Sequence, residues 1–523
     1  MKGAIAAGHP LTARAGADVL AAGGNAFDAC IAAAFVSWVA ESPLTGPGAG
    51  GFLLAHRGTG TNSGPGEELL DFFVAVPGRA LEGDCDEMDA VEVAFAPGNT
   101  QIFLVGAASC AVPGTVAGLA DAHRRYATKA WADLIRPAID LARGGVELNE
   151  MQAFLHGVLD PVLRFTPDSR RIYGETGALH AGDRISTPDL AATLELLADE
   201  GPEPFYRGEL ARRISECVRA QGGRITEDDL GAYRVVRRRP LRAAYRGADF
   251  VSNPPPSAGG VLIAFALRVL DRLEPGRVGS PEAIAALAAV MREATRARGG
   301  SFVRDLHRGG LAERLLGDER IDEAERSARE RSGVFAREPS GLPSTTHISV
   351  VDGDGNAASL SASTGCGSGI VVPGTGIHLN NMLGEVDLNP SGGVGTPGRR
   401  LTSMMAPSLV VRDGLPRAVL GSAGSIRLRG AILQIVVNVV DHGMRVDDAV
   451  AAPRVHLEGE RLHLEGGIDA EVADRLEAAG YDLVRWDTRN LYFGGASCVA
   501  RGENGELEAA GDPRRGGTGL VVA

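Results

Sequence analysis

The strongest constraint on the fold is an abrupt change in character at residue 345. Residues 311–344 are first highly charged and then rich in Pro, Gly and Ser, with little apolar periodicity, which is typical of an exposed linker. Two strand-like runs follow at once, at 345–352 and 357–363, and the residues between them, Gly353-Asp354-Gly355-Asn356, suit a tight turn. The chain is therefore predicted to pass directly from an exposed linker into a β-hairpin.

Helical periodicity dominates the first 300 residues. It is clear over 13–40, where Gly-Gly-Asn at 23–25 would end one helix and start the next. Further helices are expected at 112–125, 131–143, 188–198, 208–220 and 281–297. After the hairpin, short strands at 409–411 and 418–420 precede an amphipathic helix over 428–440. The chain therefore reads as a mixed α and β protein without internal repeats.

Composition restricts the partners and the location. The 523 residues include 53 Lys and Arg against 66 Asp and Glu, a formal charge of −13, so phosphate backbones and anionic lipids would be repelled. We therefore expect a small-molecule substrate, with no nucleic acid and no membrane as partners. The six cysteines have no paired spacing, and the first residues show no secretion signal. These features favour reduced thiols and a cytoplasmic location.

The segment around residue 345 resembles a known family. Residues 344–356 read Ser-Thr-Thr-His-Ile-Ser-Val-Val-Asp-Gly-Asp-Gly-Asn and are similar to the processing site of the γ-glutamyltranspeptidase family. Other segments that recur in the family's order are 9–12, 23–29, 48–52, 379–381, 400–404, 421–425 and 452–454.

The resemblance implies both a fold and a maturation step. The fold is α+β, a four-layer αββα sandwich of the N-terminal nucleophile hydrolase type. The resemblance also implies a precursor that cuts itself between Ser344 and Thr345. Residues 1–344 would then form a large subunit and residues 345–523 a small subunit, interleaved in one αββα unit.

The chemistry of such a cut follows from the residues themselves. A threonine hydroxyl is a weak nucleophile near pH 7, but an N-terminal threonine carries its own base, an α-amine with a pKa of about 7.7–8.0. The branched side chain has few χ1 options, so little entropy is lost in holding the hydroxyl in place. Thr345 is therefore the predicted catalytic nucleophile. The alternative is that Thr345 merely opens a hairpin in an uncut chain.

Two further features are predicted to support Thr345. A glycine-rich turn at 421–425 precedes the helix at 428–440 and would supply backbone N–H groups to an oxyanion. By resemblance, the family's paired oxyanion glycines correspond to Gly424 and Ser425, and serine can serve there provided that its φ is not positive. The resemblance also implies that the Ser363 hydroxyl bonds to the nucleophile. The alternatives are an ordinary helix cap and a strand hydroxyl that faces solvent.

The substrate contacts are predicted from the resemblance as well. Thr402 and Ser403 match the paired residues that bind the α-carboxylate of a γ-glutamyl donor. Glu385 stands where the family has a carboxylate that binds the α-ammonium, and Asn381 is included among these contacts.

Three departures from the family pattern weaken the match to a γ-glutamyl donor. Phe73 stands where the family has the arginine expected to pair with the carboxylate. Gly365 stands where it has an asparagine. The stretch 387–399 is short and has no tyrosine, so the lid that covers the pocket in some members is expected to be absent.

These observations leave three hypotheses for function. The first is a self-processing γ-glutamyltransferase or glutathione hydrolase-like enzyme, which cleaves a γ-glutamyl amide through a γ-glutamyl-threonine ester and transfers the acyl group to water or an amine. The second is an acylase for another acyl amide, as in the cephalosporin acylases that resemble this family. The third is a binding scaffold that is never processed. The mechanism requires no cofactor and no metal, and none is predicted.

Three other patterns receive structural interpretations. Residues 46–51 match GxGxxG, but a helix precedes them and a strand-like run follows, the reverse of the order in a dinucleotide site. The His and Glu residues at 456–465 alternate as in a solvated hairpin rather than a metal site. His347 would point to the opposite face of its strand from Thr346, so a structural role is favoured over a role as a base.

Overall fold

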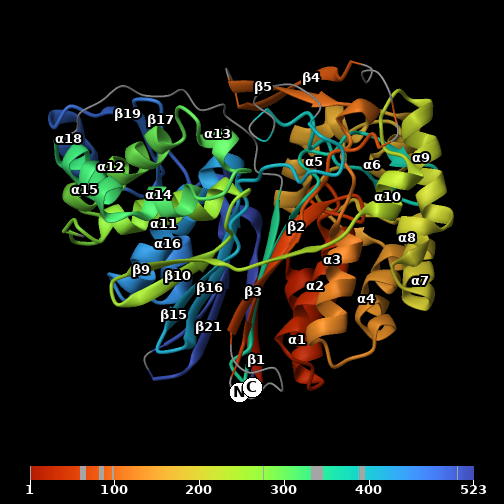
Figure 1. Ribbon diagram of the computed structural model, residues 1–523, viewed down its shortest axis with the longest axis horizontal. Coiled ribbons are helices and arrows are strands. Elements are labelled where there is room, and N and C mark those ends of the chain that lie inside the picture. Colours follow the sequence, from red (N-terminus) through yellow and green to blue (C-terminus); the bar gives the residue numbers. More distant parts are fainter. Residues whose placement is uncertain are drawn as a thin grey trace.

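Two antiparallel sheets lie face to face between two layers of helices (Figure 1). In this computed structural model, the described residues are 2–58, 66–79, 81, 87–96, 99–274, 276–330, 345–386, 388, 395–502 and 504–523. One apolar core lies between the two sheets, and a further core lies between each sheet and its own helices. The predicted four-layer αββα sandwich is therefore confirmed.

Strands from both sides of residue 345 contribute to both sheets. The first sheet has the order β22-β1-β11-β12-β2-β3-β8 and the second the order β21-β20-β16-β15-β10-β9. The strands of the first sheet are β1 (Gly3–Ala7), β2 (Gly50–Arg57), β3 (Gly66–Phe72), β8 (Val236–Arg238), β11 (Thr346–Asp352), β12 (Ala357–Ser363) and β22 (Thr518–Val522). Those of the second are β9 (Leu241–Tyr245), β10 (Ala248–Ser252), β15 (Ser408–Arg412), β16 (Leu415–Ala423), β20 (Gly495–Arg501) and β21 (Leu507–Gly511).

The helices divide between the outer faces of the two sheets (Figure 1). Beside the first sheet lie α1 (Pro10–Ala21), α2 (Ala26–Ala40), α3 (Thr115–Tyr126), α4 (Trp131–Gly144), α5 (Glu150–Leu163), α6 (Pro167–Tyr173), α7 (Pro188–Glu200), α8 (Glu203–Arg207), α9 (Glu209–Ala220) and α10 (Glu227–Ala232). Beside the second lie α11 (Ala258–Leu270), α12 (Pro281–Ala297), α13 (Phe302–Asp305), α14 (Leu311–Leu316), α15 (Asp318–Glu330), α16 (Leu428–Val440), α17 (Val446–Ala451) and α18 (Ala470–Ala478).

Short elements complete the described structure. Small separate sheets are formed by β4 (Asp89–Ala96) with β5 (Asn99–Val105), β6 (Val146–Glu147) with β7 (Arg184–Ile185), β13 (Val371–Val372) with β14 (Ile377–His378), and β17 (Val455–Glu458) with β18 (Arg461–Leu464) and β19 (Asp482–Arg485). Single 3₁₀ turns are η1 (Ala107–Ser109), η2 (Ser425–Arg427), η3 (Leu491–Phe493) and η4 (Pro513–Arg515). None of the described helices combines the length and the apolarity needed to cross a bilayer.

The predicted hairpin forms and is fixed to the helical layer. In β11 and β12, Thr346 pairs with Ala362, and the turn between the strands is closed by Asp352. The Asp352 carboxylate accepts hydrogen bonds from the backbone N–H of Asn356 at 3.0 Å and of Ala26 at 2.9 Å. Because Ala26 is the first residue of α2, one side chain joins the hairpin turn to the start of that helix. This connection fixes the end of β11.

Helix α2 is buried on all sides. Every residue from Ala26 to Ala40 is buried, as its almost uniformly apolar sequence requires. Asn25 caps the helix, with Asp28 reaching back to the Asn25 backbone N–H, so the Gly-Gly-Asn break predicted at 23–25 is confirmed. The chain leaves α2 at Glu41, a buried carboxylate that lies beside the start of β11.

Two sequence predictions need correction. Residues 311–330, assigned to an exposed linker, form α14 and α15, because Ile321, Ala324 and Ala328 lie on one face of α15 and pack into the core of the second sheet. Residues 331–344 lie outside the described residues. Helix α16 was expected to be amphipathic, but residues 428–437 are all buried because the second sheet and other helices surround it.

Candidate active site

A cavity of about 50 Å³ lies at the start of β11. Five of the predicted site residues line it, although they come from distant parts of the sequence: Thr345, Ser363, Glu385, Ser403 and Ser425. The other lining residues are Phe73, Gly365, Met382, Leu388, Met404, Met405 and Leu428. Larger hollows of about 930 and 570 Å³ occur elsewhere among the described residues, and neither contains a predicted site residue. The fold therefore brings most of the predicted site together at one place.

Thr345 and its neighbour Thr346 are fixed by contacts with two distant charged side chains. Its side chain lines the cavity, and the whole residue is only 7% exposed. The Thr345 carbonyl accepts a hydrogen bond from the guanidinium of Arg515. The next residue, Thr346, donates its hydroxyl to the Glu41 carboxylate at 2.6 Å. Ser344, the other half of the predicted cleavage site, lies outside the described residues.

Ser363 ends β12, beside Thr345, the residue directly before β11. It is 4% exposed, so the alternative of a strand hydroxyl facing solvent does not hold. Its Oγ accepts a hydrogen bond from the Gly365 backbone N–H at 2.9 Å. The hairpin register accounts for this position, because Thr346 and Ala362 are cross-strand partners and the residues beyond them meet at the same end.

The turn after β16 has an unusual backbone. Gly424 has φ of 135° and Ser425 has φ of 49°, and η2 and α16 follow directly. The condition set for serine at this position, a φ that is not positive, is therefore not met, because the chain enters η2 through a left-handed residue. A non-glycine residue in this region typically carries about 1–3 kcal/mol of strain, which favours a functional site over an ordinary helix cap. Ser425 lines the cavity, whereas Gly424 lies just outside it.

The predicted substrate contacts divide into two pairs. Glu385 and Ser403 line the cavity. Thr402 and Asn381 do not, because their side chains are engaged elsewhere. The Thr402 hydroxyl donates to the Leu388 carbonyl at 2.8 Å. The Asn381 side chain accepts from the Cys366 N–H at 3.0 Å and donates to the Leu104 carbonyl at 3.2 Å, which shapes the loop around Gly365.

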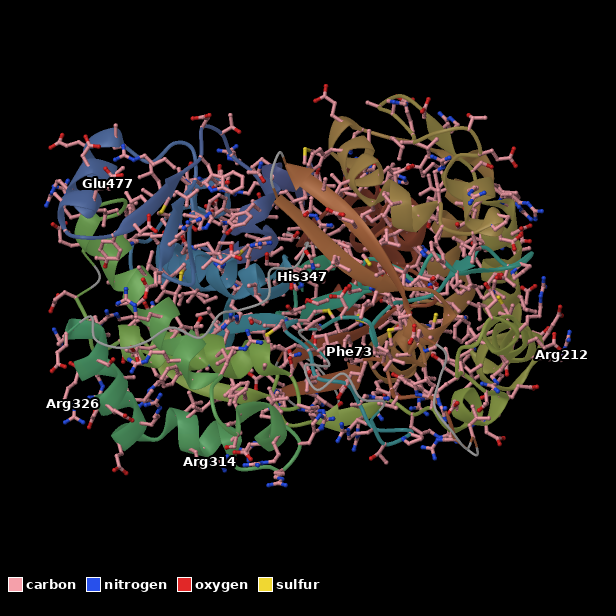
Figure 2. All side chains as sticks on the ribbon, turned by 90° about the horizontal axis from the view of Figure 1, so that it is seen from above. Phe73, Arg212, Arg314, Arg326, His347 and Glu477 are labelled. Carbon is pink, nitrogen blue, oxygen red and sulfur yellow. The ribbon has the colours of Figure 1, made fainter. Side chains whose placement is uncertain are left out.

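His347 lies between the two sheets and not in the cavity. Its ring nitrogens are 2.8 Å from the Ser361 hydroxyl and 3.0 Å from the Ser349 hydroxyl, on the face of β11 opposite Thr346 and Glu41. Figure 2 shows it near the middle of the molecule, far from labelled surface residues such as Arg212 and Arg326. Burial lowers the pKa of His347 to about 3, so the ring is neutral and only weakly basic near pH 7. A structural role fits this environment better than a role as a base.

Replacing His347 with leucine is expected to lower the free energy of unfolding by about 1–3 kcal/mol, because the buried Ser361 hydroxyl loses its partner. Urea-induced unfolding measures this change. His180, whose side chain is 84% exposed, provides the matched control, and His180→Leu should have little effect. A structural residue should also leave the pH dependence of any activity unchanged, so a shifted pH profile in His347→Leu would contradict this assignment.

The two segments that resemble a dinucleotide motif and a metal site form ordinary structural elements. The helix α2 precedes residues 46–51 and β2 begins at Gly50, within them, as expected for a sequence that is not a dinucleotide site. Residues 455–464 form the hairpin β17–β18. The expectation of a solvated face there is wrong in part, because His456 is buried against Tyr492, and Glu465, which directly follows β18, is buried against Arg514. No cluster of three or more His, Cys, Asp or Glu suited to a metal ion occurs in the described part of the chain.

Sequence comparison assigns the whole arrangement to a family. A family model for Gamma-glutamyltranspeptidase matches residues 12–522. The chain belongs to the γ-glutamyltranspeptidase family. It is 32% identical to the Acylase ACY 1 proenzyme of Pseudomonas sp. (strain V22), over 100% of this chain and 94% of that protein. It is also 32% identical to the Glutathione hydrolase proenzyme of Escherichia coli (strain K12), over 98% and 90%.

Solved structures agree with this assignment. The cephalosporin acylase from Bacillus halodurans superposes with a TM-score of 0.82 at 27% identity, covering 99% of this chain and 95% of that one. The γ-glutamyltranspeptidase of Helicobacter pylori gives a TM-score of 0.52 at 29% identity, covering 61% and 90%. This chain is therefore an enzyme of a family whose relatives of similar length bear both hydrolase and acylase names.

The γ-glutamyltranspeptidase pattern is altered where a carboxylate would bind. Phe73, in place of the expected arginine, is 1% exposed and stacks on Phe52 with ring centroids 5.4 Å apart. Figure 2 shows Phe73 near the middle of the molecule, as it does His347. Gly365 has φ of 70°, and a Cβ there would lie 2.0 Å from Asn381 Oδ1, so this loop has no room for the expected asparagine.

No other cation among the described residues replaces that arginine. Among the described residues that line the cavity, Glu385 is charged and none is basic. Arg400 lies 3.4 Å from Asp71 and stacks over the Tyr233 ring at 4.4 Å. Arg427 stacks over the Tyr492 ring at 4.0 Å. Arg400 and Arg427 are therefore both engaged outside the cavity.

The sequence interpretation missed Glu41 and Arg515. Both contact the start of β11, but they are 305 and 170 residues away from their partners. Glu41 carries a weak signal, since a carboxylate directly after an apolar helix must find a buried partner. Arg515 carries no local signal, because only the fold brings η4 beside Thr345.

Proposed function

We propose that this member of the family is a self-processing amide hydrolase with Thr345 as nucleophile. Its substrate would be an amide whose acyl group is largely apolar. The observation that carries this proposal is the lining of the Thr345 cavity. Its apolar residues are Phe73, Met382, Leu388, Met404, Met405 and Leu428. A buried carboxylate without a cation is strongly disfavoured, so this site favours an acyl group that carries no carboxylate.

The proposed mechanism uses the residues that line the cavity. Cleavage before Thr345 frees its α-amine. In each turnover, this amine takes the Thr345 hydroxyl proton as Oγ bonds to the substrate carbonyl carbon. The proton then passes to the leaving amine as the C–N bond breaks, which leaves an acyl ester on Thr345. Water then attacks the ester, with the α-amine again taking the proton. This step releases a carboxylic acid and restores the Thr345 hydroxyl.

The neighbouring groups have supporting roles in this proposal. The strained turn at Gly424 and Ser425 would donate backbone N–H groups to the developing oxyanion, since a positive φ strains serine without removing its N–H. Ser363 would hold the Thr345 hydroxyl. His347 is a poor candidate for the base because its pKa of about 3 makes it nearly unable to take a proton at pH 7.

A second candidate is the transfer of a γ-glutamyl group to water or an amine. It is favoured by Glu385 and Ser403, which line the cavity and could bind the α-ammonium and α-carboxylate of such a donor. The Escherichia coli relative named Glutathione hydrolase proenzyme is also consistent with it. The missing arginine weighs against this candidate.

Four p-nitroanilides separate the two candidates. Butyryl, 4-aminobutyryl, glutaryl and γ-glutamyl anilides share one four-carbon chain and carry at C4 no charge, an ammonium, a carboxylate, or both. The proposal predicts the higher kcat/KM for the two substrates without a carboxylate. If the γ-glutamyl anilide is cleaved best, the second candidate is correct. An enzyme that is cut before Thr345 but cleaves none of the four would contradict both substrate assignments.

Replacing Phe73 with arginine tests the basis of this preference. The new cation is expected to raise kcat/KM for the γ-glutamyl and glutaryl anilides relative to the butyryl anilide by about 10- to 100-fold, the worth of one charge-assisted pair. Phe73→Met is the control, because it keeps an apolar side chain and should leave the order of substrates unchanged. Thermal unfolding of each variant shows whether the loss of the Phe52 stack alters the fold. If the folded Phe73→Arg enzyme shows the same order of kcat/KM for the anilides as the wild type, the proposal is contradicted.

A further inference from the structure

Arg515 is a buried cation in direct contact with the nucleophilic residue. It ends η4, is 4% exposed, and donates from Nη1 to the Thr345 carbonyl. Its other terminal nitrogen, Nη2, is buried and has no hydrogen-bond partner among the described residues. A guanidinium that is buried and only partly satisfied is costly for stability, which points to a role other than holding the fold.

The neighbouring strand is built to admit this side chain. At Gly495, the first residue of β20, a Cβ would lie 1.8 Å from Arg515 Cδ. Any other residue there would push the guanidinium away from Thr345. The glycine and the arginine therefore form a matched pair, although they are separated in sequence.

Among the described residues, Arg515 is the cation in contact with Thr345. Glu41 accepts hydrogen bonds from the hydroxyls of Thr346 at 2.6 Å and Thr12 at 2.8 Å, with the buried His9 close by. Glu385 lies across the cavity, and His347 is neutral.

The described elements packed against this end of β11 add no further charge close to Thr345. Strands β1 and β12 have no ionisable side chains, and on α2 Asp28 lies at the far end from Glu41. Arg417 and Arg501 lie at the ends of β16 and β20 that are remote from Gly495. Burial lowers the pKa of Arg515, while Glu41 and Asp512 act in the opposite direction. Arginine nevertheless stays protonated in proteins.

Building on the proposed function, we propose that Arg515 is a positioning residue that fixes the Thr345 carbonyl and, by its positive charge, keeps the Thr345 α-amine in its uncharged form. The amine and the carbonyl belong to the same residue, so the guanidinium is only a few ångströms from the amine. A like charge within about 4–6 Å disfavours the protonated form. Since an α-amine normally titrates near 7.7–8.0, this shift increases the fraction of free base at neutral pH.

The test compares variants that separate charge from hydrogen bonding. Arg515→Gln keeps a donor but loses the charge, and Arg515→Lys keeps the charge. Arg475→Gln, at an exposed ion pair with Glu282, is the control for overall charge. The acidic limb of kcat/KM against pH reports the base of the free enzyme. We expect its midpoint to rise by about one unit in Arg515→Gln, with activity about tenfold lower at pH 6 and nearly normal at pH 9. Arg515→Lys should keep the wild-type midpoint, because it keeps the charge, although its overall activity is lower because the ammonium does not reproduce the guanidinium contact. Arg475→Gln should match the wild type in both midpoint and activity.

Other results would overturn the inference. A merely structural residue would lower activity at every pH without moving the midpoint. If the Arg515→Gln variant is not cut, the test uses Gly495→Ala instead, because this variant keeps Arg515 but displaces its guanidinium. An unchanged pH midpoint of kcat/KM in Gly495→Ala would contradict the inference. Intact mass and the Thr345→Ala variant test the proposed function separately. If the enzyme is cut and depends on Thr345, but its pH midpoint is the same with and without Arg515, the proposed function stands and this inference is wrong.

Discussion

Replacing Thr345 with alanine is expected to leave the 523-residue chain in one piece and to lower amide cleavage by about 10³- to 10⁶-fold, the usual effect of removing a nucleophile. The alanine variant lacks the hydroxyl that attacks the peptide before residue 345 and, in the mature enzyme, the substrate. Intact mass measures the first effect, and anilide hydrolysis measures the second. Wild type should separate into pieces of roughly two-thirds and one-third of the chain.

Thr345→Ser provides the matched control. It keeps the hydroxyl and loses one methyl group, so it should still be cut, with lower activity because its side chain has more rotamers to lose. Thermal unfolding should show that the alanine variant is folded. If wild type stays whole and inert while folded, the catalytic assignment fails and a binding scaffold becomes the better description. If Thr345→Ala is cut before residue 345, another nucleophile must perform the cleavage.

Local sequence patterns predicted the parts of the fold that depend on neighbouring residues. The hairpin of β11 and β12 follows from alternating apolar residues around an Asp-Gly-Asn turn, and its register alone brings Ser363 beside Thr345. The break at 23–25 was visible because glycine and asparagine end and begin helices. Charge patterning was less reliable. Helix α15 was overlooked because only Ile321, Ala324 and Ala328 mark its buried face.

The direction in which a side chain points could not be predicted from residue type. Thr402 and Asn381 have suitable groups for a substrate, but their hydrogen bonds are made with the backbone of Leu388, Cys366 and Leu104. The positive φ of Ser425 was also hidden, since serine rarely adopts it and only the geometry of the turn after β16 imposes it. Such features arise from contacts between distant segments, which no local pattern encodes.

Replacing Arg514 with methionine is expected to cause the largest loss of stability among these variants. Arg514 lies in a buried group of four charges with Arg454, Asp512 and Glu465, and all four side chains are at most 2% exposed. Arg514 contacts Glu465 through Nε at 2.7 Å and Asp512 through Nη1 at 3.1 Å. Removing one partner from such a group typically costs about 3–5 kcal/mol, because the remaining charges stay buried without compensation.

The same substitution should also impair cleavage before Thr345. Arg514 lies within η4, the turn that carries Arg515, and its loss would release the turn that places that guanidinium on the Thr345 carbonyl. Arg485→Met is the control, since Arg485 forms exposed ion pairs with Asp474 and Glu477 that are worth about 0–1 kcal/mol. Urea-induced unfolding and intact mass measure the two effects. If the two variants unfold at the same urea concentration, the buried group does not hold η4, and the position of Arg515 must be set by Gly495 and β20 instead.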